Sequence, residues 1–145
     1  MAKNGKARII SIVNKKGGVG KTITTMNLGA ALMEQGRKVL LVDLDPQCSL
    51  TICAHIDVEE LDGCSLYDAL MPHSEIGLAD IIRKAEPSGL DIAPANIDLD
   101  DADEELSRQY MREFRLKNAL EPVLNDYDDI LLDCPPHTGM LTINA

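Results

Sequence analysis

Near its N-terminal end the chain carries the segment Lys15-Lys16-Gly17-Gly18-Val19-Gly20-Lys21-Thr22. Loops that bind phosphate groups usually read G-x-x-x-x-G-K-S/T, and this segment departs from that pattern only at the first position, where Lys15 replaces glycine. Small residues allow successive backbone N–H groups from Gly17 to Thr22 to curl around a phosphate, and a helix that follows would point its positive end at the same anion. Lys21 would then reach the outer phosphates. The segment therefore predicts a nucleotide-binding loop.

Lys16 is an additional lysine, five positions before Lys21. It lies too far back on the loop to be needed for the phosphate cradle. One interpretation is that it reaches outward to a nucleotide held by a second copy of the protein, as an arginine finger acts in trans. The other interpretation is a solvated charge, which is the more common role of a lysine before a pair of glycines.

The residues on either side of the loop predict a strand, a helix and a second strand. Four of the five residues in Ile9–Val13 are β-branched, as in a buried parallel strand. The segment Lys21–Gln35 contains good helix formers and stops before Gly36, a suitable C-terminal cap. Small residues at 29–31 would let this helix lie close to the sheet. Lys38–Asp43 is a second apolar strand, and together these elements make a βαβ unit.

Beyond Pro46 the pattern is weaker and predicts shorter elements. The clearest is a strand at Asp128–Asp133, an apolar run that ends on a carboxylate. The other predicted elements are a helix at Leu66–Met71 capped by Ser65, a helix from Ser74 to near Lys84, a strand at Leu90–Pro94, a helix capped by Asp100, and a helix from Arg112 toward Asn125. The sequence thus predicts one α/β domain with a mostly parallel sheet flanked by helices.

Phosphoryl transfer needs cations around the phosphates, a metal held by oxygen ligands, and a group that orients the attacking water. Thr22 offers a hydroxyl for Mg²⁺, and Asp133 at the end of its strand would hold the metal through water. Asp43 and Asp45 lie two residues apart, so a strand continuing through both would point them to the same face. Their spacing alone does not assign a separate role to each.

Three motifs in this order resemble the ParA/Soj/MinD ATPases with a deviant Walker A motif, and most closely the ParA/Soj partition branch. The motifs are Lys16 to Thr22, Asp43-Leu44-Asp45-Pro46-Gln47, and Asp133-Cys134-Pro135-Pro136-His137-Thr138-Gly139-Met140-Leu141-Thr142-Ile143-Asn144-Ala145. The resemblance implies a P-loop NTPase fold of the SIMIBI type. It also implies that the four predicted strands lie in the spatial order 3-2-4-1, which would leave Ile9–Val13 at an open edge of the sheet.

The resemblance also implies the cofactors ATP and Mg²⁺ and a role for each matching residue. Lys16 and Lys21 would act on the phosphates, Asp45 would orient the hydrolytic water, and Asp43 would support the metal region alongside Thr22 and Asp133. The implied nucleotide-binding residues are Lys16, Gly17, Gly18, Val19, Gly20, Lys21, Thr22 and Ile23. Each Lys16 would touch the partner's phosphates in an ATP-sandwich dimer, so the protein would switch between monomer and dimer.

The sequence departs from the family pattern in two places and ends early. Cys48 and Ser49 replace the usual glycine and asparagine after Gln47, and Ile23 replaces a commonly seen threonine. The match ends inside a helix that should follow Asp133, so we expect residues 1–145 to be the N-terminal part of a single ParA-like domain, C-terminally truncated. Such a chain could cradle phosphate and hydrolyse ATP poorly, and a non-catalytic nucleotide-binding or dimerisation module is the alternative.

The resemblance further implies a ParB-like partner protein, and DNA binding mainly through the portion that is missing here. The net charge of −10 is unevenly distributed: residues 1–45 hold eight basic and three acidic side chains, whereas residues 46–145 hold six and twenty-one. A chain this acidic repels nucleic acid unless its basic groups cluster, and the only basic cluster surrounds the nucleotide loop. No apolar run approaches the ~18 residues that span a bilayer, and Met1–Lys6 lacks a signal-peptide core, so we expect a cytoplasmic protein without a membrane partner.

Other readings of the sequence are weaker. Dinucleotide binding would need a third glycine after Gly18-Val19-Gly20, and none follows. The acidic stretch Asp98–Glu105 lacks the glycine and the glutamate of a calcium loop. The four cysteines show no C-x-x-C pair and predict free thiols. Two further alternatives stay open. One is a metal-cluster carrier ATPase of the same superfamily, and the other is a zinc site built from Cys48, Cys53, His55 and Cys64.

Overall fold

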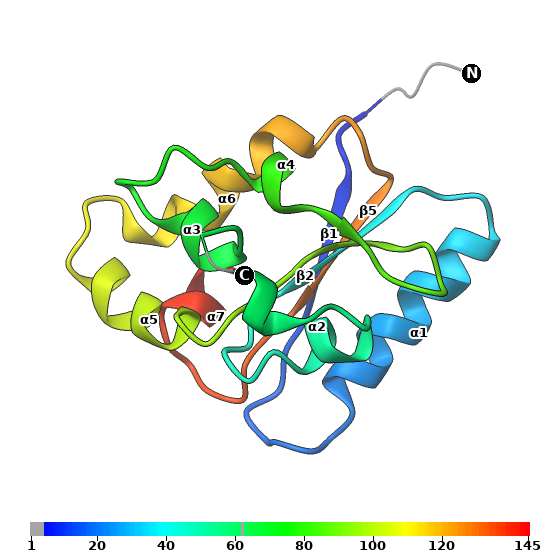
Figure 1. The fold of residues 1–145 in the computed structure, drawn as a ribbon, viewed down its shortest axis with the longest axis horizontal. Helices are drawn as coiled ribbons and strands as arrows, with labels where there is room; N and C mark the ends of the chain where they lie inside the picture. The colour runs from blue at the N-terminus through cyan, green and yellow to red at the C-terminus, as the bar shows by residue number, and fades with distance from the viewer. Residues whose placement is uncertain (1–4, 62) are drawn as a thin grey trace.

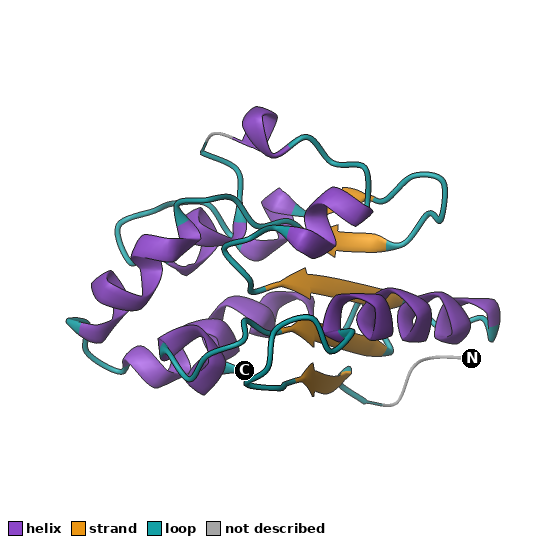
Figure 2. Ribbon diagram, turned by 90° about the horizontal axis from the view of Figure 1, so that it is seen from below, coloured by secondary structure: helices purple, strands orange, loops and turns teal. Residues whose placement is uncertain are grey.

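The computed structural model describes residues 5–61 and 63–145, so the first four residues of the N-terminal stretch considered above lie outside it. A five-stranded sheet forms the centre of the molecule in the order β1-β5-β2-β4-β3, and Figures 1 and 2 show its strands lying side by side. The strands are β1 (Arg8–Ile12), β2 (Val39–Asp43), β3 (Arg83–Lys84), β4 (Asp91–Ala93) and β5 (Asp129–Asp133). All neighbours are parallel except β3 and β4.

The predicted order of the four parallel strands is confirmed, with β1 at an edge of the described sheet. The strand β3 was not predicted, because its residues fall where the sequence indicated the end of a helix. That helix is wrong in part: the chain forms only the short helix α4 (Leu78–Ile81) and then pairs β3 with β4. A two-residue strand is too short to show a period of two, so nothing in the sequence pattern marks it.

Helices cover the two faces of the sheet and enclose two apolar layers. On one face α1 (Lys21–Glu34) and α2 (Ser49–Cys53) pack over the side chains of Leu41, Ile92 and Leu131. On the other face the layer includes Leu40 and Leu132. It is covered by α4 and by α3 (Leu66–Leu70), α5 (Leu99–Ser107), α6 (Arg115–Leu120) and α7 (Met140–Asn144). Figure 1 shows α1 on one side of the sheet and α3, α5, α6 and α7 on the other.

The predicted helix over Lys21–Gln35 is confirmed to within one residue as α1. Its close approach to the sheet depends on Gly29, because a Cβ at this position would lie 2.8 Å from Leu41 Cδ2. The predicted helix from Arg112 toward Asn125 is broken into three pieces. They are the 3-10 helix η2 (Arg112–Phe114), α6, and the 3-10 helix η3 (Glu121–Val123). Another 3-10 helix, η1 (Val58–Leu61), lies earlier in the chain.

Pro122 explains the interruption between α6 and η3. Proline has no backbone N–H and its ring clashes with the carbonyl four residues earlier, so it sits only in the first turn of a helix. The helix α5 begins at Leu99, two residues earlier than expected from a cap at Asp100. None of the helices in the described part of the chain is both long and apolar enough to cross a bilayer.

At the N-terminal ends of the strands a buried carboxylate fixes the register of β5. Asp129 is 0% exposed and accepts hydrogen bonds from Arg8 Nε at 2.8 Å and from the guanidinium of Arg37. Burial alone would raise the pKa of Asp129, but the hydrogen bonds from Arg37 and Arg8 outweigh it and hold the pKa below its usual value. Because Arg8 begins β1 and Arg37 precedes β2, this cluster links β1, β5 and β2.

We predict that Asp129→Asn lowers the free energy of unfolding at pH 7 by about 2 kcal/mol, because two charged donors lose their charged acceptor. A carboxyl whose folded-state pKa is lowered stabilises the fold above its unfolded pKa, and that contribution is lost as the pH falls below about 4. Urea denaturation at pH 7 and pH 3 measures this, and the difference between wild type and variant should shrink at pH 3.

The exposed pair between Lys6 and Glu121, 63% and 64% exposed, provides the control. Glu121→Gln should change stability by less than about 0.5 kcal/mol. Equal effects of the two substitutions at pH 7 would show that the buried cluster does not secure the sheet.

Candidate nucleotide site

The loop between β1 and α1 lies at the carboxyl ends of β1, β5 and β2. Asp133 at the end of β5 pairs in register with Ile12 of β1 and with Asp43 of β2, so both carboxylates lie at the edge of the sheet where the loop begins. Ligands of open α/β sheets bind at this edge. The fold therefore brings the three sequence motifs together, although they are spread over more than 110 residues.

The backbone of the loop requires glycine at two positions. Gly18 has a φ of 69° and Gly20, the residue before α1, has a φ of 91°, and both values lie in the left-handed region. A Cβ placed on Gly17, Gly18 or Gly20 would meet no atom within 4 Å. The loop thus presents bare backbone to open space, and the N–H groups at the start of α1 face the same side.

This open space is a cavity of about 390 Å³. Its lining contains most of the predicted nucleotide-binding residues and Asp45, together with three residues that the sequence did not indicate, Ser49, Cys53 and Pro136. The predicted residues that line it are Gly17, Gly18, Gly20, Lys21, Thr22 and Ile23. Val19 and Lys16 belong to the same loop, where both are exposed.

Beneath the loop, α1 contacts β5 through hydroxyl groups. Thr22 Oγ1 donates a hydrogen bond to Asp133 Oδ2 at 2.7 Å, and Thr25 Oγ1 lies 3.5 Å from Asp133 Oδ1. Burial raises the pKa of Asp133, and the negative charge of Asp45 acts in the same direction, whereas the bond from Thr22 and the charge of Lys21 oppose both. The role of Thr25 was missed, although its position one helical turn after Thr22 places it on the same face.

Asp43 is fully buried and bonded on both oxygens. Its Oδ1 accepts from the backbone N–H of Asp45 at 3.1 Å, and its Oδ2 accepts from the N–H and the hydroxyl of Thr51 at 2.8 and 2.7 Å. Burial raises its pKa to about 7 against these bonds, with a smaller contribution from the nearby Asp133. These contacts show that Asp43 organises the loop after β2, and its support of a metal stays a prediction.

Asp45 stands apart from Asp43. The strand β2 ends at Asp43, so the two carboxylates do not share one strand face: Asp43 is buried and Asp45 is half-buried on the cavity wall. The Oδ1 of Asp45 accepts a hydrogen bond from the backbone N–H of Gln47 at 3.0 Å, which closes a turn. Asp45 therefore belongs to the turn after β2 and lines the same cavity as Thr22.

Three comparisons with known proteins agree on the family. A protein-family model described as an AAA domain matches residues 7–145. The sporulation initiation inhibitor protein Soj of Bacillus subtilis is 48% identical over 138 residues, which are 95% of this chain and 53% of that protein. The chromosome partitioning protein ParA of Myxococcus xanthus is 44% identical over 138 residues, 95% of this chain and 48% of that protein.

A solved structure shows the same fold. Cobyrinic acid a,c-diamide synthase from Mycobacterium smegmatis, with bound ADP and magnesium, superposes with a TM-score of 0.90 at 41% identity. The match covers 95% of this chain and 55% of that one. The chain belongs to this AAA-domain family. Within it the chain is a relative of the ParA and Soj proteins, and it spans about half the length of the relatives it matches.

The structure shows how Cys48 is accommodated at a position where it departs from the family's sequence pattern. Cys48 has a φ of 56°, in the left-handed region where glycine is favoured, at the position where ParA/Soj sequences usually carry glycine. The side chain is buried and its Sγ contacts Pro46 O at 3.2 Å. In this member of the family the packing of the sulfur offsets a backbone conformation that costs about 1 kcal/mol for residues with a Cβ.

The loop after β5 in this family member is tied to α5. Asp103 Oδ1 accepts from the N–H of Leu141 at 2.9 Å, and its Oδ2 lies 3.7 Å from His137 Nδ1. The fit is tight, because a Cβ on Gly139 would lie only 1.9 Å from Asp103 Oδ2. Asp103 thus holds the first turn of α7 and the loop that follows Asp133.

The zinc alternative finds no support in the structure. Within residues 5–61 and 63–145, no three histidine, cysteine, aspartate or glutamate side chains gather closely enough to hold a metal ion. All four cysteines are free, as the sequence predicted. Asp133 and Thr22 instead offer a carboxylate and a hydroxyl side by side, the oxygen ligands that Mg²⁺ prefers.

Thr51 was not indicated by the sequence, and its substitution tests the network around Asp43. Besides donating to Asp43, its hydroxyl accepts the N–H of Ala95 at 2.9 Å. We predict that Thr51→Val destabilises the protein by about 2–4 kcal/mol, because it keeps the shape, leaves the buried N–H of Ala95 unpaired and removes the hydroxyl bond to the buried Asp43. Thr51→Ser, the matched control, keeps the hydroxyl and should cost about 1 kcal/mol. Chemical denaturation measures both, and equal losses would show that the hydroxyl is dispensable.

Proposed function

We propose that this chain is the nucleotide-binding part of a ParA/Soj-like partition ATPase, which binds ATP with Mg²⁺, hydrolyses it to ADP and phosphate, and forms a sandwich dimer in the ATP-bound state. The observation that carries the proposal is the hydrogen bond of 2.7 Å between Thr22 and Asp133 beneath an open glycine loop. A loop that merely turned the chain would need neither a hydroxyl and carboxylate pair below it nor bare backbone above it.

The residues present fit a magnesium nucleotide. The N–H groups of the loop and the start of α1 would bind phosphate oxygens, Lys21 would neutralise the outer phosphates, and Thr22 with Asp133 would hold the metal. Bound Mg²⁺ would supply neutralisation of the charge on the phosphate oxygens during transfer. Asp45, which lines the same cavity as Thr22, would orient the water that attacks the terminal phosphate and accept its proton.

Lys16 carries the proposed dimer switch. Among the described residues its hydrogen bonds are made by the backbone: its N–H donates to Asn14 Oδ1 at 3.0 Å, and its carbonyl accepts from Lys21 Nζ at 3.4 Å. Its side chain is exposed at the outer rim of the loop, which leaves the ammonium available to a second nucleotide site. The names of the relatives indicate partition of chromosomes, so we propose a ParB-like partner and DNA as further ligands of the whole protein.

A second candidate function is nucleotide-independent self-association. It is favoured by β1, which forms an edge of the described sheet and carries exposed apolar side chains, with Ile9 43% exposed and, just after the strand, Val13 52% exposed. Edges of this kind pair readily with other chains. The two candidates differ in whether ATP is needed for the dimer.

The dimer is tested by light scattering after gel filtration, with and without a non-hydrolysable ATP analogue and Mg²⁺. We predict that Lys16→Ala stays monomeric with the analogue while its nucleotide affinity changes by less than about threefold, because its ammonium serves the other subunit. Lys21→Ala should lose nucleotide affinity by about 100-fold, since a charged donor to phosphate is removed. The control is Lys15→Ala, a change at the exposed residue next to Lys16, and this variant should behave as wild type.

A Lys16→Ala protein that still dimerises with the analogue would contradict the role in trans. A dimer that forms equally without nucleotide, in wild type and variant alike, would favour association through the β1 edge.

Cys53 reports on the cavity itself, because it is exposed and lies in the lining. We predict that Mg-ATP at ten times its dissociation constant slows the alkylation of Cys53 by N-ethylmaleimide about tenfold, in proportion to the unoccupied fraction. Mass spectrometry of the digested protein measures the rate, with the half-buried Cys64 as an internal control that should not change. Equal protection of both thiols, or of neither while calorimetry detects binding, would place the nucleotide elsewhere.

A further inference from the structure

The loop that joins β5 to α7, residues 134–139, forms part of the wall of the nucleotide cavity. It begins directly after Asp133, the last residue of β5. Pro136 lines the cavity together with Thr22 and Asp45. The position of this loop therefore sets the shape of the wall beside the proposed ligands of the metal.

The loop can attach itself to the rest of the protein by few backbone bonds, because two of its six residues, Pro135 and Pro136, have no N–H to donate. At its start the N–H of Cys134 donates to Ile12 O at 3.3 Å, which fixes the loop to the end of β1. The bonds of His137 are local. Its Nδ1 accepts from the N–H two residues later at 3.2 Å, and its carbonyl accepts from a hydroxyl of α7 at 2.6 Å. An anchor for the other end of the loop has to come from outside it.

Asp103 of α5 is this anchor. Its Oδ1 accepts a hydrogen bond from the N–H of Leu141 at 2.9 Å, in the first turn of α7, and its Oδ2 lies 3.7 Å from His137 Nδ1. Gly139 packs on the same carboxylate so closely that a Cβ there would lie 1.9 Å from Oδ2. Gly139 has a φ of −79°, which any residue can adopt. The contact with Asp103, rather than the backbone conformation, is therefore what excludes a side chain at this position.

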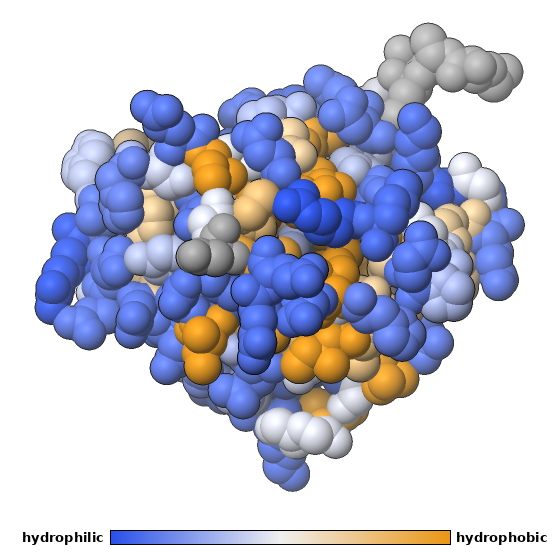
Figure 3. Space-filling view, viewed as in Figure 1, coloured by the Kyte–Doolittle hydropathy of each residue, from blue (hydrophilic) through white to orange (hydrophobic). Residues whose placement is uncertain are grey.

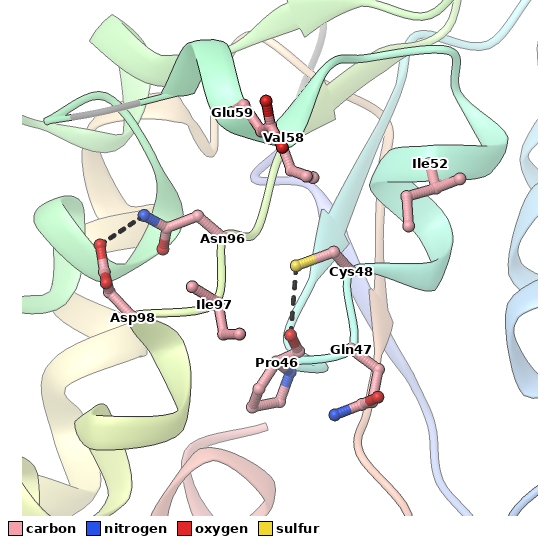
Figure 4. A pocket seen from close by; sticks show the side chains of 9 residues that line it. All are labelled: Pro46, Gln47, Cys48, Ile52, Val58, Glu59, Asn96, Ile97 and Asp98. Atoms are coloured by element: carbon pink, nitrogen blue, oxygen red, sulfur yellow. Dashed lines mark hydrogen bonds between the residues drawn. The ribbon is translucent and has the colours of Figure 1, made fainter.

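The helix that carries Asp103 is fixed independently of the loop. It packs three buried apolar side chains into the core, those of Leu99, Ala102 and Leu106. Figure 3 shows mainly hydrophilic side chains over the part of the surface where Figure 1 places α5. Just before the helix Asn96 Nδ2 donates to Asp98 Oδ2 at 2.7 Å, and Figure 4 shows this bond facing the loop after β2. The carboxylate of Asp103 is thus held in place by packing that does not involve a nucleotide.

We propose that Asp103 is a positioning residue of the nucleotide site, which fixes the loop between β5 and α7 so that Pro136 is in place before the nucleotide binds. This inference rests on the nucleotide site proposed above. Asp103 is not among the described residues that line the cavity, so it acts through Gly139 and the first turn of α7. A loop that is fixed in advance loses little conformational freedom on binding, whereas a free loop must be ordered at the expense of affinity.

Calorimetric titration with Mg-ADP tests the role of the carboxylate. We expect Asp103→Ala to weaken binding by about tenfold, because the loop would have to be ordered during binding. Asp103→Asn offers an oxygen that can still accept the N–H of Leu141, and its affinity should stay within about threefold of wild type. The control is Asp101→Ala, a change at an exposed aspartate of the same helix, which should alter the affinity by less than about twofold.

A general loss of stability has to be separated from a loss of positioning. Asp129→Asn weakens the sheet at the strand ends that lie opposite to the nucleotide cavity, so its affinity for Mg-ADP should stay within about twofold of wild type. Hydrogen exchange without nucleotide reports on the anchor itself. The N–H of Leu141 should exchange at least about tenfold faster in Asp103→Ala than in Asp103→Asn, because only the latter keeps an acceptor.

Gly139→Ala disturbs the same contact from the other side. Its Cβ would displace the carboxylate of Asp103, so we expect binding of Mg-ADP to weaken by about tenfold. In the double variant with Asp103→Ala the new methyl group has the space of the missing carboxylate. Its affinity should therefore lie within about twofold of that of Asp103→Ala, since the two changes remove one contact. If Asp103→Ala fails to fold, Gly139→Ala compared with Asp129→Asn decides.

The outcomes separate this inference from the proposed function. Wild-type protein that binds no Mg-ADP would overturn the proposed function, and the role of Asp103 with it. Normal binding by wild type and by Asp103→Ala alike would overturn the role of Asp103 alone. The same role would be refuted by an equal loss of affinity in Asp129→Asn, or by a loss of about a hundredfold in the double variant, which would show that the two residues act separately.

Discussion

Asp133 accepts a hydrogen bond from the hydroxyl of Thr22 because β5 lies between β1 and β2, although it follows β2 by 85 residues of chain. The parallel register Ile12–Asp133–Asp43 aligns the ends of three strands, and the loop after β1 therefore begins directly above the two carboxylates. At the opposite ends of the same strands Arg8, Asp129 and Arg37 fix this register with buried charge. A shift of β5 by one residue would turn Asp133 to the other face of the sheet and bury an unpaired aspartate.

The parts of the fold that could be predicted from the sequence are those with long apolar runs and local caps. The strands β1, β2 and β5 each have such a run, and α1 begins after the glycines and ends beside Gly36. The order of the strands came from the resemblance, since no local pattern tells β5 to enter between β1 and β2. Between residues 46 and 125 the elements are short, and tertiary contacts set their boundaries. For example, β3 exists only because β4 is beside it.

The site was predictable where backbone chemistry demands particular residues and less so where side chains bond in three dimensions. The two left-handed glycines and the lysine at the start of α1 are visible in the pattern. The pairing of Asp43 with Thr51 is not, because the two residues lie eight apart in different elements, one at the end of β2 and the other in α2. Spacing suggested that Asp43 and Asp45 share a face. The end of β2 at Asp43 separates them, one buried as a support and the other on the cavity wall.

The same support joins the nucleotide cavity to a neighbouring one, which is lined by Pro46–Cys48 and Asn96–Asp98. Thr51 donates its N–H and its hydroxyl to Asp43 and accepts the N–H of Ala95, and Ala95 directly precedes Asn96. Both ends of the loop after β2 are therefore fixed, by Asp43 at the strand and by Thr51 in α2. Between these two anchors lie residues 45–48, and Cys48 holds a left-handed conformation. These residues form a wall of each cavity, with Asp45 on one side and Pro46 to Cys48 on the other.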